Sequence, residues 1–118
     1  MSELTDLLAD AGRRLEPEIR SRLNGMLGGI LRAYIPQCWE FRTDAGAATL
    51  TVGPDGASTA AEGLATAPDV TIEIPFATLR TALTTRTRAP GSSTSIRVTP
   101  HTTKGRAAFD YLRGRIGL

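Results

Sequence analysis

Four short stretches of the chain alternate apolar and polar side chains with a period of two, the pattern of a half-buried β-strand. They cover residues 39–42, 49–52, 70–74 and 95–99. Successive strand side chains point to opposite faces of a sheet, so the apolar and polar members can each share a face. The apolar set is Trp39, Phe41, Leu50, Val52, Val70, Ile72, Ile74, Ile96 and Val98. The polar set, expected on a solvated face, is Glu40, Arg42, Thr49, Thr51, Thr71, Glu73, Ser95, Arg97 and Thr99.

Helical periodicity dominates the segment before the first strand. Apolar residues recur at steps of three and four and predict helix over residues 3–35. Pro17 is expected to break or kink this helix near Leu15, because proline lacks an N–H and clashes with the preceding turn. The apolar positions are Leu4, Leu8, Ala11, Leu15, Ile19, Leu23, Met26, Leu27, Ile30, Leu31 and Tyr34.

Three further elements follow from local signals. Small residues over 57–62, after the Pro54-Asp55-Gly56 turn, predict a weak edge strand. Pro75 suits the first turn of a helix whose apolar face is Phe76, Leu79, Ala82 and Leu83. Thr102 or Thr103 can cap a final helix with Ala108, Phe109, Tyr111 and Leu112 as its apolar residues.

Three glycines fall inside the predicted N-terminal helix, at positions 25, 28 and 29. Each costs about 1 kcal/mol relative to alanine in a helix interior. They allow either close packing of the helix on the sheet or room for a ligand, and both alternatives stay open.

Length and composition predict one domain over residues 1–118, with a helical segment at 3–35 and the sheet and remaining helices at 38–116. The longest apolar run, residues 26–31, is too short to span a bilayer. Cys38 is the only cysteine, so no intramolecular disulfide can form. The acidic N-terminus is unlike a signal peptide, and we expect a cytoplasmic location.

Charge is distributed unevenly along the chain. Residues 1–76 carry a net charge of −5 and residues 77–118 carry +7, which together give the overall +2. The basic C-terminal third could face an anionic membrane or simply form a solvated surface that pairs with the acidic N-terminal helix. Nucleic acid is a poor fit, because the chain has few aromatic residues for base stacking and its basic residues do not form one stripe.

The residue types that carry most enzymatic chemistry are sparse. His101 is the only histidine and lies after a proline in a loop, away in sequence from Cys38. The carboxylates of Asp55, Asp69 and Glu73 are expected in solvent rather than in an acid–base site. No phosphate-binding glycine motif and no cluster of metal ligands is present. We therefore predict a non-enzymatic protein with no metal and no cofactor.

The order of elements resembles a sterol carrier protein 2 (SCP2) domain over residues 20–113. The residues that carry the resemblance are Trp39-Glu40-Phe41, Leu50-Thr51-Val52-Gly53 and, above all, residues 67–72 leading into Phe76 and Leu79. The resemblance implies an α+β fold, in which a single five-stranded sheet of mixed, mostly antiparallel strands is covered on one face by helices. It also implies an apolar tunnel between the layers that holds a fatty acyl chain, a sterol or another lipid.

Such a tunnel would be lined by the apolar residues of both layers, with position 31 left unassigned. The candidate ligand-binding residues are Leu23, Leu27, Trp39, Phe41, Leu50, Val52, Ile72, Ile74, Phe76, Leu79, Leu83, Ile96, Phe109 and Leu112. The leading hypothesis is binding or transfer of a lipid or another apolar small molecule. The alternative is a structural or partner-binding module on the same fold, in which these side chains fill the core. Dimerisation is open under both hypotheses.

Overall fold

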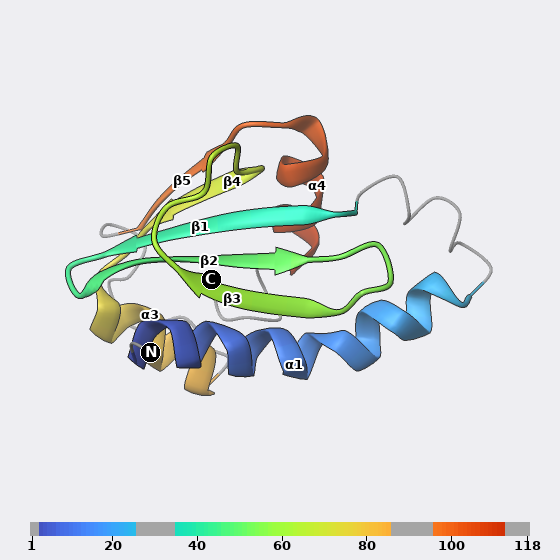
Figure 1. Ribbon diagram of the computed structural model, residues 1–118, viewed down its shortest axis with the longest axis horizontal. Helices are drawn as coiled ribbons and strands as arrows, with labels where there is room; N and C mark the ends of the chain where they lie inside the picture. The colour runs from blue at the N-terminus through green and yellow to red at the C-terminus, as the bar shows by residue number, and fades with distance from the viewer. Residues whose placement is uncertain (1–2, 26–34, 86–95, 113–118) are drawn as a thin grey trace.

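The computed structural model describes residues 3–25, 35–85 and 96–112. These residues form three helices and five strands, which follow one another along the chain (Figure 1). In order they are α1 (Glu3–Leu23), β1 (Gln37–Thr43), β2 (Gly46–Val52), β3 (Ser58–Glu62), β4 (Val70–Glu73), α3 (Phe76–Thr85), β5 (Arg97–Pro100) and α4 (Thr103–Leu112).

The five strands form one mixed sheet in the order β3-β2-β1-β4-β5. β1 and β4 are parallel, and the other neighbouring pairs are antiparallel. The register aligns Trp39 with Leu50 and Val70, and Phe41 with Ile72, so the apolar members of three strands share one face. The predicted one-sided sheet is confirmed, including the weak strand of small residues, which is the β3 edge.

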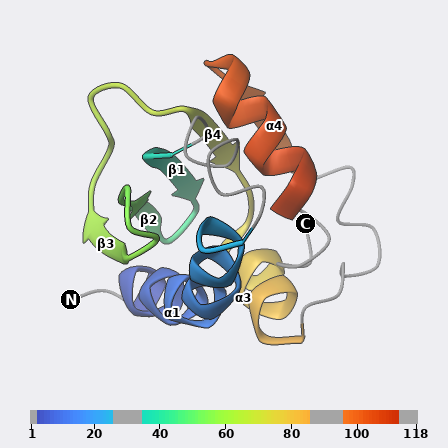
Figure 2. The ribbon, with the colours of Figure 1, turned by 90° about the vertical axis from the view of Figure 1, so that its right-hand side faces the viewer.

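All three helices lie on the apolar face of the sheet. α1 runs along β2 and β3, α3 lies beside α1, and α4 packs near the start of β1 and β4 and beside β5. The end-on view shows the helices on one side, while the connection from β3 to β4 passes on the other side (Figure 2). The predicted α+β fold, a five-stranded sheet covered on one face by helices, is therefore confirmed.

The contact between α1 and the sheet depends on a glycine that the sequence patterns did not single out. A Cβ atom at Gly12 would lie 2.4 Å from Ser58 Oγ and 3.1 Å from Leu50 Cδ1. Ser58 also holds the helix, because its N–H and its hydroxyl both donate to Glu16 Oε1, at 2.9 and 3.0 Å. These two donors lower the pKa of Glu16. Close backbone approach thus occurs at Gly12, whereas Gly25 lies exposed beyond the end of α1.

The predicted interruption at Pro17 is wrong. α1 is a single helix of 21 residues with Pro17 inside it and exposed. A proline inside a helix costs about 3 kcal/mol, but apolar side chains on both sides of Pro17 pack on the same sheet. Leu8 and Leu15 belong to the core on one side, and Leu23 is buried against the β2–β3 turn on the other. Tertiary packing therefore outweighs the lost hydrogen bond, and the predicted continuation over residues 26–34 lies outside the described residues.

The starts of the other two helices follow local capping. The Phe76 N–H donates to Asp44 Oδ1 at 2.7 Å, so a carboxylate from the β1–β2 turn caps α3. In α4 the N–H of Gly105 donates to Thr102 Oγ1 at 2.9 Å, which confirms Thr102 as the cap. The sequence predicted both helix starts, but it did not predict that a residue 32 positions away caps α3.

Candidate functional site

Most of the predicted ligand-binding residues come together between the sheet and the helices. Eight belong to the buried core, and Phe76 and Ile96 pack against it. The helices add Leu4, Leu8 and Ala11, which the pattern placed on the apolar face of the first helix but not in the site. The eight core members are Trp39, Phe41, Leu50, Ile72, Ile74, Leu79, Leu83 and Phe109.

Four predicted residues fall outside this cluster or outside the description. Leu23 is buried, but it packs against the β2–β3 turn, 3.6 Å from where a Cβ of Gly56 would lie. Val52 is only half-buried, at the end of β2 beside Gln37. Leu27 and the side chain of Leu112 lie outside the described residues.

The centre of the apolar layer is closely packed. Phe41, Ile72 and Leu79 are each less than 2% exposed, so neighbouring atoms enclose them. At one end of the layer, the rings of Trp39 and Phe109 lie 5.6 Å apart at an angle of 51°, which is a favourable aromatic contact. Any ligand between the layers would therefore require the helices to move away from the sheet.

The opposite face of the sheet is polar, but it is not uniformly solvated as the alternation predicted. Glu40 is only 2% exposed and Thr71 only 7%. The N–H of Ala65, in the β3–β4 connection, donates to Glu40 Oε1 at 3.1 Å. This connection covers the middle of the polar face, an effect that a period of two cannot reveal.

Hydrogen bonds link the covered polar residues in a chain. Thr71 Oγ1 donates to Glu40 Oε2 at 3.0 Å, and His101 Nε2 lies 2.8 Å from the same hydroxyl. A hydroxyl has one proton, so His101 Nε2 donates to Thr71. The sequence patterns missed this chain, because β1, β4 and the residue after β5 meet only in the folded sheet.

Asp69 is the second buried carboxylate, and the prediction that it lies in solvent is wrong. Its Oδ2 accepts the Cys38 N–H at 2.9 Å, and its Oδ1 accepts the Thr102 hydroxyl at 2.8 Å. Lys104 Nζ lies 3.8 Å from Oδ1. Asp69 therefore joins β1, the start of β4 and the start of α4. Its position immediately before β4 was visible in the sequence, but its partners were not.

Cys38 lies on the polar side of β1, half-buried. Burial raises the pKa of its thiol, and the carboxylates of Asp69 and Glu40 raise it further against the lowering effect of a hydrogen bond from Thr51. A raised pKa leaves little of the reactive thiolate near neutral pH. Among the residues that the structure describes, no group of three or more His, Cys, Asp or Glu side chains could hold a metal ion.

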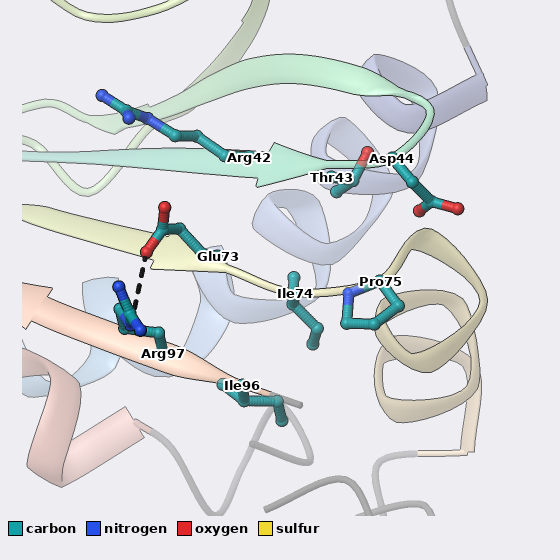
Figure 3. A pocket seen from close by; sticks show the side chains of 8 residues that line it. All are labelled: Arg42, Thr43, Asp44, Glu73, Ile74, Pro75, Ile96 and Arg97. Carbon is teal, nitrogen blue, oxygen red and sulfur yellow. Dashed lines mark ion pairs between the residues drawn. The ribbon is translucent and has the colours of Figure 1, made fainter. Parts of the chain in front are cut away.

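An open groove of about 600 Å³ lies at the end of the sheet where β1 and β4 finish and β5 begins (Figure 3). Its lining combines two arginines and two carboxylates with apolar side chains, two of which belong to or pack against the core. The lining residues are Arg42, Thr43, Asp44, Glu73, Ile74, Pro75, Ile96 and Arg97. Sequence reasoning named Ile74 and Ile96 but missed the charged part of the groove.

The charged side chains of the groove form a row across three strands. The register places Arg42 of β1 beside Glu73 of β4, and Glu73 beside Arg97 of β5. Arg97 Nε lies 3.8 Å from Glu73 Oε2, the ion pair marked in Figure 3. Arg42 Nε donates to Glu40 Oε2 at 3.1 Å, which joins the groove to the buried carboxylate.

No model of a known family matches the sequence, and no curated protein matches it. Solved structures do match in fold. The sterol carrier protein domain 2 of Helicoverpa armigera superposes with a TM-score of 0.57 at 12% identity, covering 100% of this chain and 94% of that one. The protein has an SCP2-like fold. At this identity the similarity establishes the fold alone.

The SCP2-like fold also matches part of a much larger protein. A stereoselective inverting sec-alkylsulfatase from Pseudomonas sp. superposes with a TM-score of 0.50 at 17% identity. The match covers 65% of this chain but only 13% of the alkylsulfatase, so this chain spans a small part of that enzyme's length. The fold is thus found both as nearly a whole chain and as a minor part of one.

Within the described ranges, no helix combines the length and the apolar composition that crossing a bilayer requires.

Proposed function

We propose that the protein binds the hydrocarbon part of a lipid, such as a fatty acyl chain or a sterol, between the sheet and helices α1, α3 and α4. The observation that carries this proposal is the superposition of the whole chain on a sterol carrier protein domain. The gathering of apolar side chains from the strands and all three helices into one layer supports it. The proposed role is binding or transfer, without catalysis.

The energetics of such binding are sufficient. Burying a chain of about twelve carbons gains roughly 10 kcal/mol at about 0.8 kcal/mol per CH₂. Association costs at least about 4 kcal/mol, which leaves an affinity in the micromolar range before any cost of opening the protein. Because Phe41, Ile72 and Leu79 are enclosed, we propose that the ligand enters as the helices separate from the sheet.

The test replaces a buried side chain of the apolar layer with a larger one. Leu83 is buried on α3, and its neighbour Thr84 on the same helix is exposed. We expect Leu83→Trp to abolish uptake of a polyene fatty acid measured by its fluorescence, because the indole occupies space that the chain needs. Thr84→Trp is the matched control and should bind like the wild type. Thermal unfolding of both variants checks that they fold.

A second candidate function is a partner-binding module with a permanently filled core. Two observations favour it: the enclosed centre of the layer, and the occurrence of the fold as 13% of a larger enzyme. Under this hypothesis the wild type takes up no fatty acid, and Leu83→Trp lowers stability by about 1–3 kcal/mol through overpacking. The cytoplasmic location, the anionic membrane contact and a homodimer remain predictions from the sequence.

A further inference from the structure

The groove at the end of the sheet contains an arginine whose orientation is fixed from beneath. Arg42 donates its Nε–H to Glu40, and the Glu40 side chain is only 3% exposed. Glu40 is itself held by the Ala65 N–H and the Thr71 hydroxyl. The Arg42 side chain is half exposed, so its two terminal amino groups can still donate to a ligand. A guanidinium fixed in this way is prepared for paired hydrogen bonds to a carboxylate or a phosphate.

The other charged residues of the groove favour a ligand with a single negative charge. Asp44 Oδ1 accepts the Phe76 N–H, and its carboxylate points toward α3, so this helix start is already capped (Figure 3). Glu73 pairs with Arg97, whose side chain is 80% exposed. With these two carboxylates nearby, a doubly charged phosphate would meet more repulsion than a carboxylate does. Arg97 stands two strand spacings from Arg42, about 10 Å, so two long side chains can reach one carboxylate from either side.

The groove adjoins the apolar layer. Ile74 follows β4, belongs to the core and donates its N–H to the Arg42 carbonyl oxygen at 3.0 Å. Ile96 precedes β5 and packs against the same core. A molecule bound to Arg42 by its charged end would therefore have apolar side chains beside its uncharged end.

We propose that this groove binds the carboxylate of an amphiphile, with Arg42 and Arg97 as its hydrogen-bond donors and the hydrocarbon chain passing Ile74 and Ile96 into the apolar layer. This inference rests on the proposed lipid binding and adds a ligand class to it, the long-chain carboxylic acids. Arg42 is the anchor, and Glu40 is a positioning residue that acts through it.

The experiment compares three probes by calorimetric titration: dodecanoate, 1-dodecanol and acetate. The wild type should bind dodecanoate about tenfold more tightly than dodecanol, as expected for a charge-assisted hydrogen bond at a half-exposed site. Arg42→Lys keeps the charge beside Glu40 but loses the paired donors, so it should remove this preference and leave dodecanol binding unchanged. Arg106→Lys, on the exposed side of α4, is the matched control and should keep the preference.

The outcomes separate the two proposals. Equal binding of dodecanoate and dodecanol, or an Arg42→Lys variant that keeps the preference, would overturn the carboxylate site while leaving lipid binding intact. Binding of acetate with no binding of either long-chain probe would support a carboxylate site in the groove but reject its connection to the apolar layer. Absence of all binding would reject both proposals. Dodecanol binding also reports whether each variant is folded, so a misfolded protein cannot be mistaken for a lost carboxylate site.

Discussion

Replacing Asp69 should destabilise the protein far more than replacing an exposed aspartate. In Asp69→Ala the Cys38 N–H and the Thr102 hydroxyl lose a charged acceptor at 2.9 and 2.8 Å. Hydrogen bonds to charged groups contribute about 1.5–3 kcal/mol each, so the free energy of unfolding should fall by about 3–5 kcal/mol. The Lys104 ion pair is partly exposed at 3.8 Å and adds less than about 1 kcal/mol.

The assay for this prediction is urea unfolding followed by the fluorescence of Trp39, the only tryptophan. Asp110→Ala is the matched control, because Asp110 is exposed on α4 and its loss should change stability by less than about 0.5 kcal/mol. A domain has only about 5–15 kcal/mol of stability in total, so Asp69→Ala should be marginally folded. If both variants unfolded at the same urea concentration, Asp69 would not be the connection between β1 and α4.

Three further predictions concern packing and ionisation. Gly105→Ala should lower the melting temperature despite the better helix propensity of alanine, because its Cβ would lie 2.4 Å from the Asp69 carbonyl oxygen; a higher melting temperature would contradict the close contact. Glu16 has a lowered pKa from the two Ser58 donors, so its contribution to stability is present at neutral pH and is lost as the pH falls through that pKa. Wild-type protein should therefore lose more stability than Glu16→Gln between neutral and acidic pH, and equal losses would refute this. Cys38 has a raised pKa, so iodoacetamide should alkylate it more slowly than a free thiol at pH 7 and at a rate that rises with pH; a rate matching free cysteine would disagree.

The hydrophobic pattern predicted the layers of this fold, because a sheet that is apolar on one face must be covered there. Alternation placed Trp39 and Phe41 on the covered face, and the register confirms it. The pattern failed at Pro17, where packing of the whole helix outweighed a local rule. Local signals describe a residue and its near neighbours, so they cannot weigh contacts made by the rest of the helix.

The charged groove was beyond the reach of the sequence for a similar reason. Arg42, Glu73 and Arg97 are far apart in the chain and become a row only through the pairing of β1, β4 and β5. Glu40 alternates as a solvated residue should, yet the β3–β4 connection covers it. The apolar part of the candidate site could be predicted, since burial follows from hydrophobicity, whereas polar contacts depend on which strands are neighbours.

Mass spectrometry under native conditions, on protein purified without detergent, is the most direct test of lipid binding. We predict a fraction of molecules that carry an added lipid mass, which organic extraction removes and which Leu83→Trp lacks while Thr84→Trp retains it. Wild-type protein with only its own mass, both as purified and after incubation with a mixture of fatty acids and sterols, would contradict lipid binding and favour the filled module.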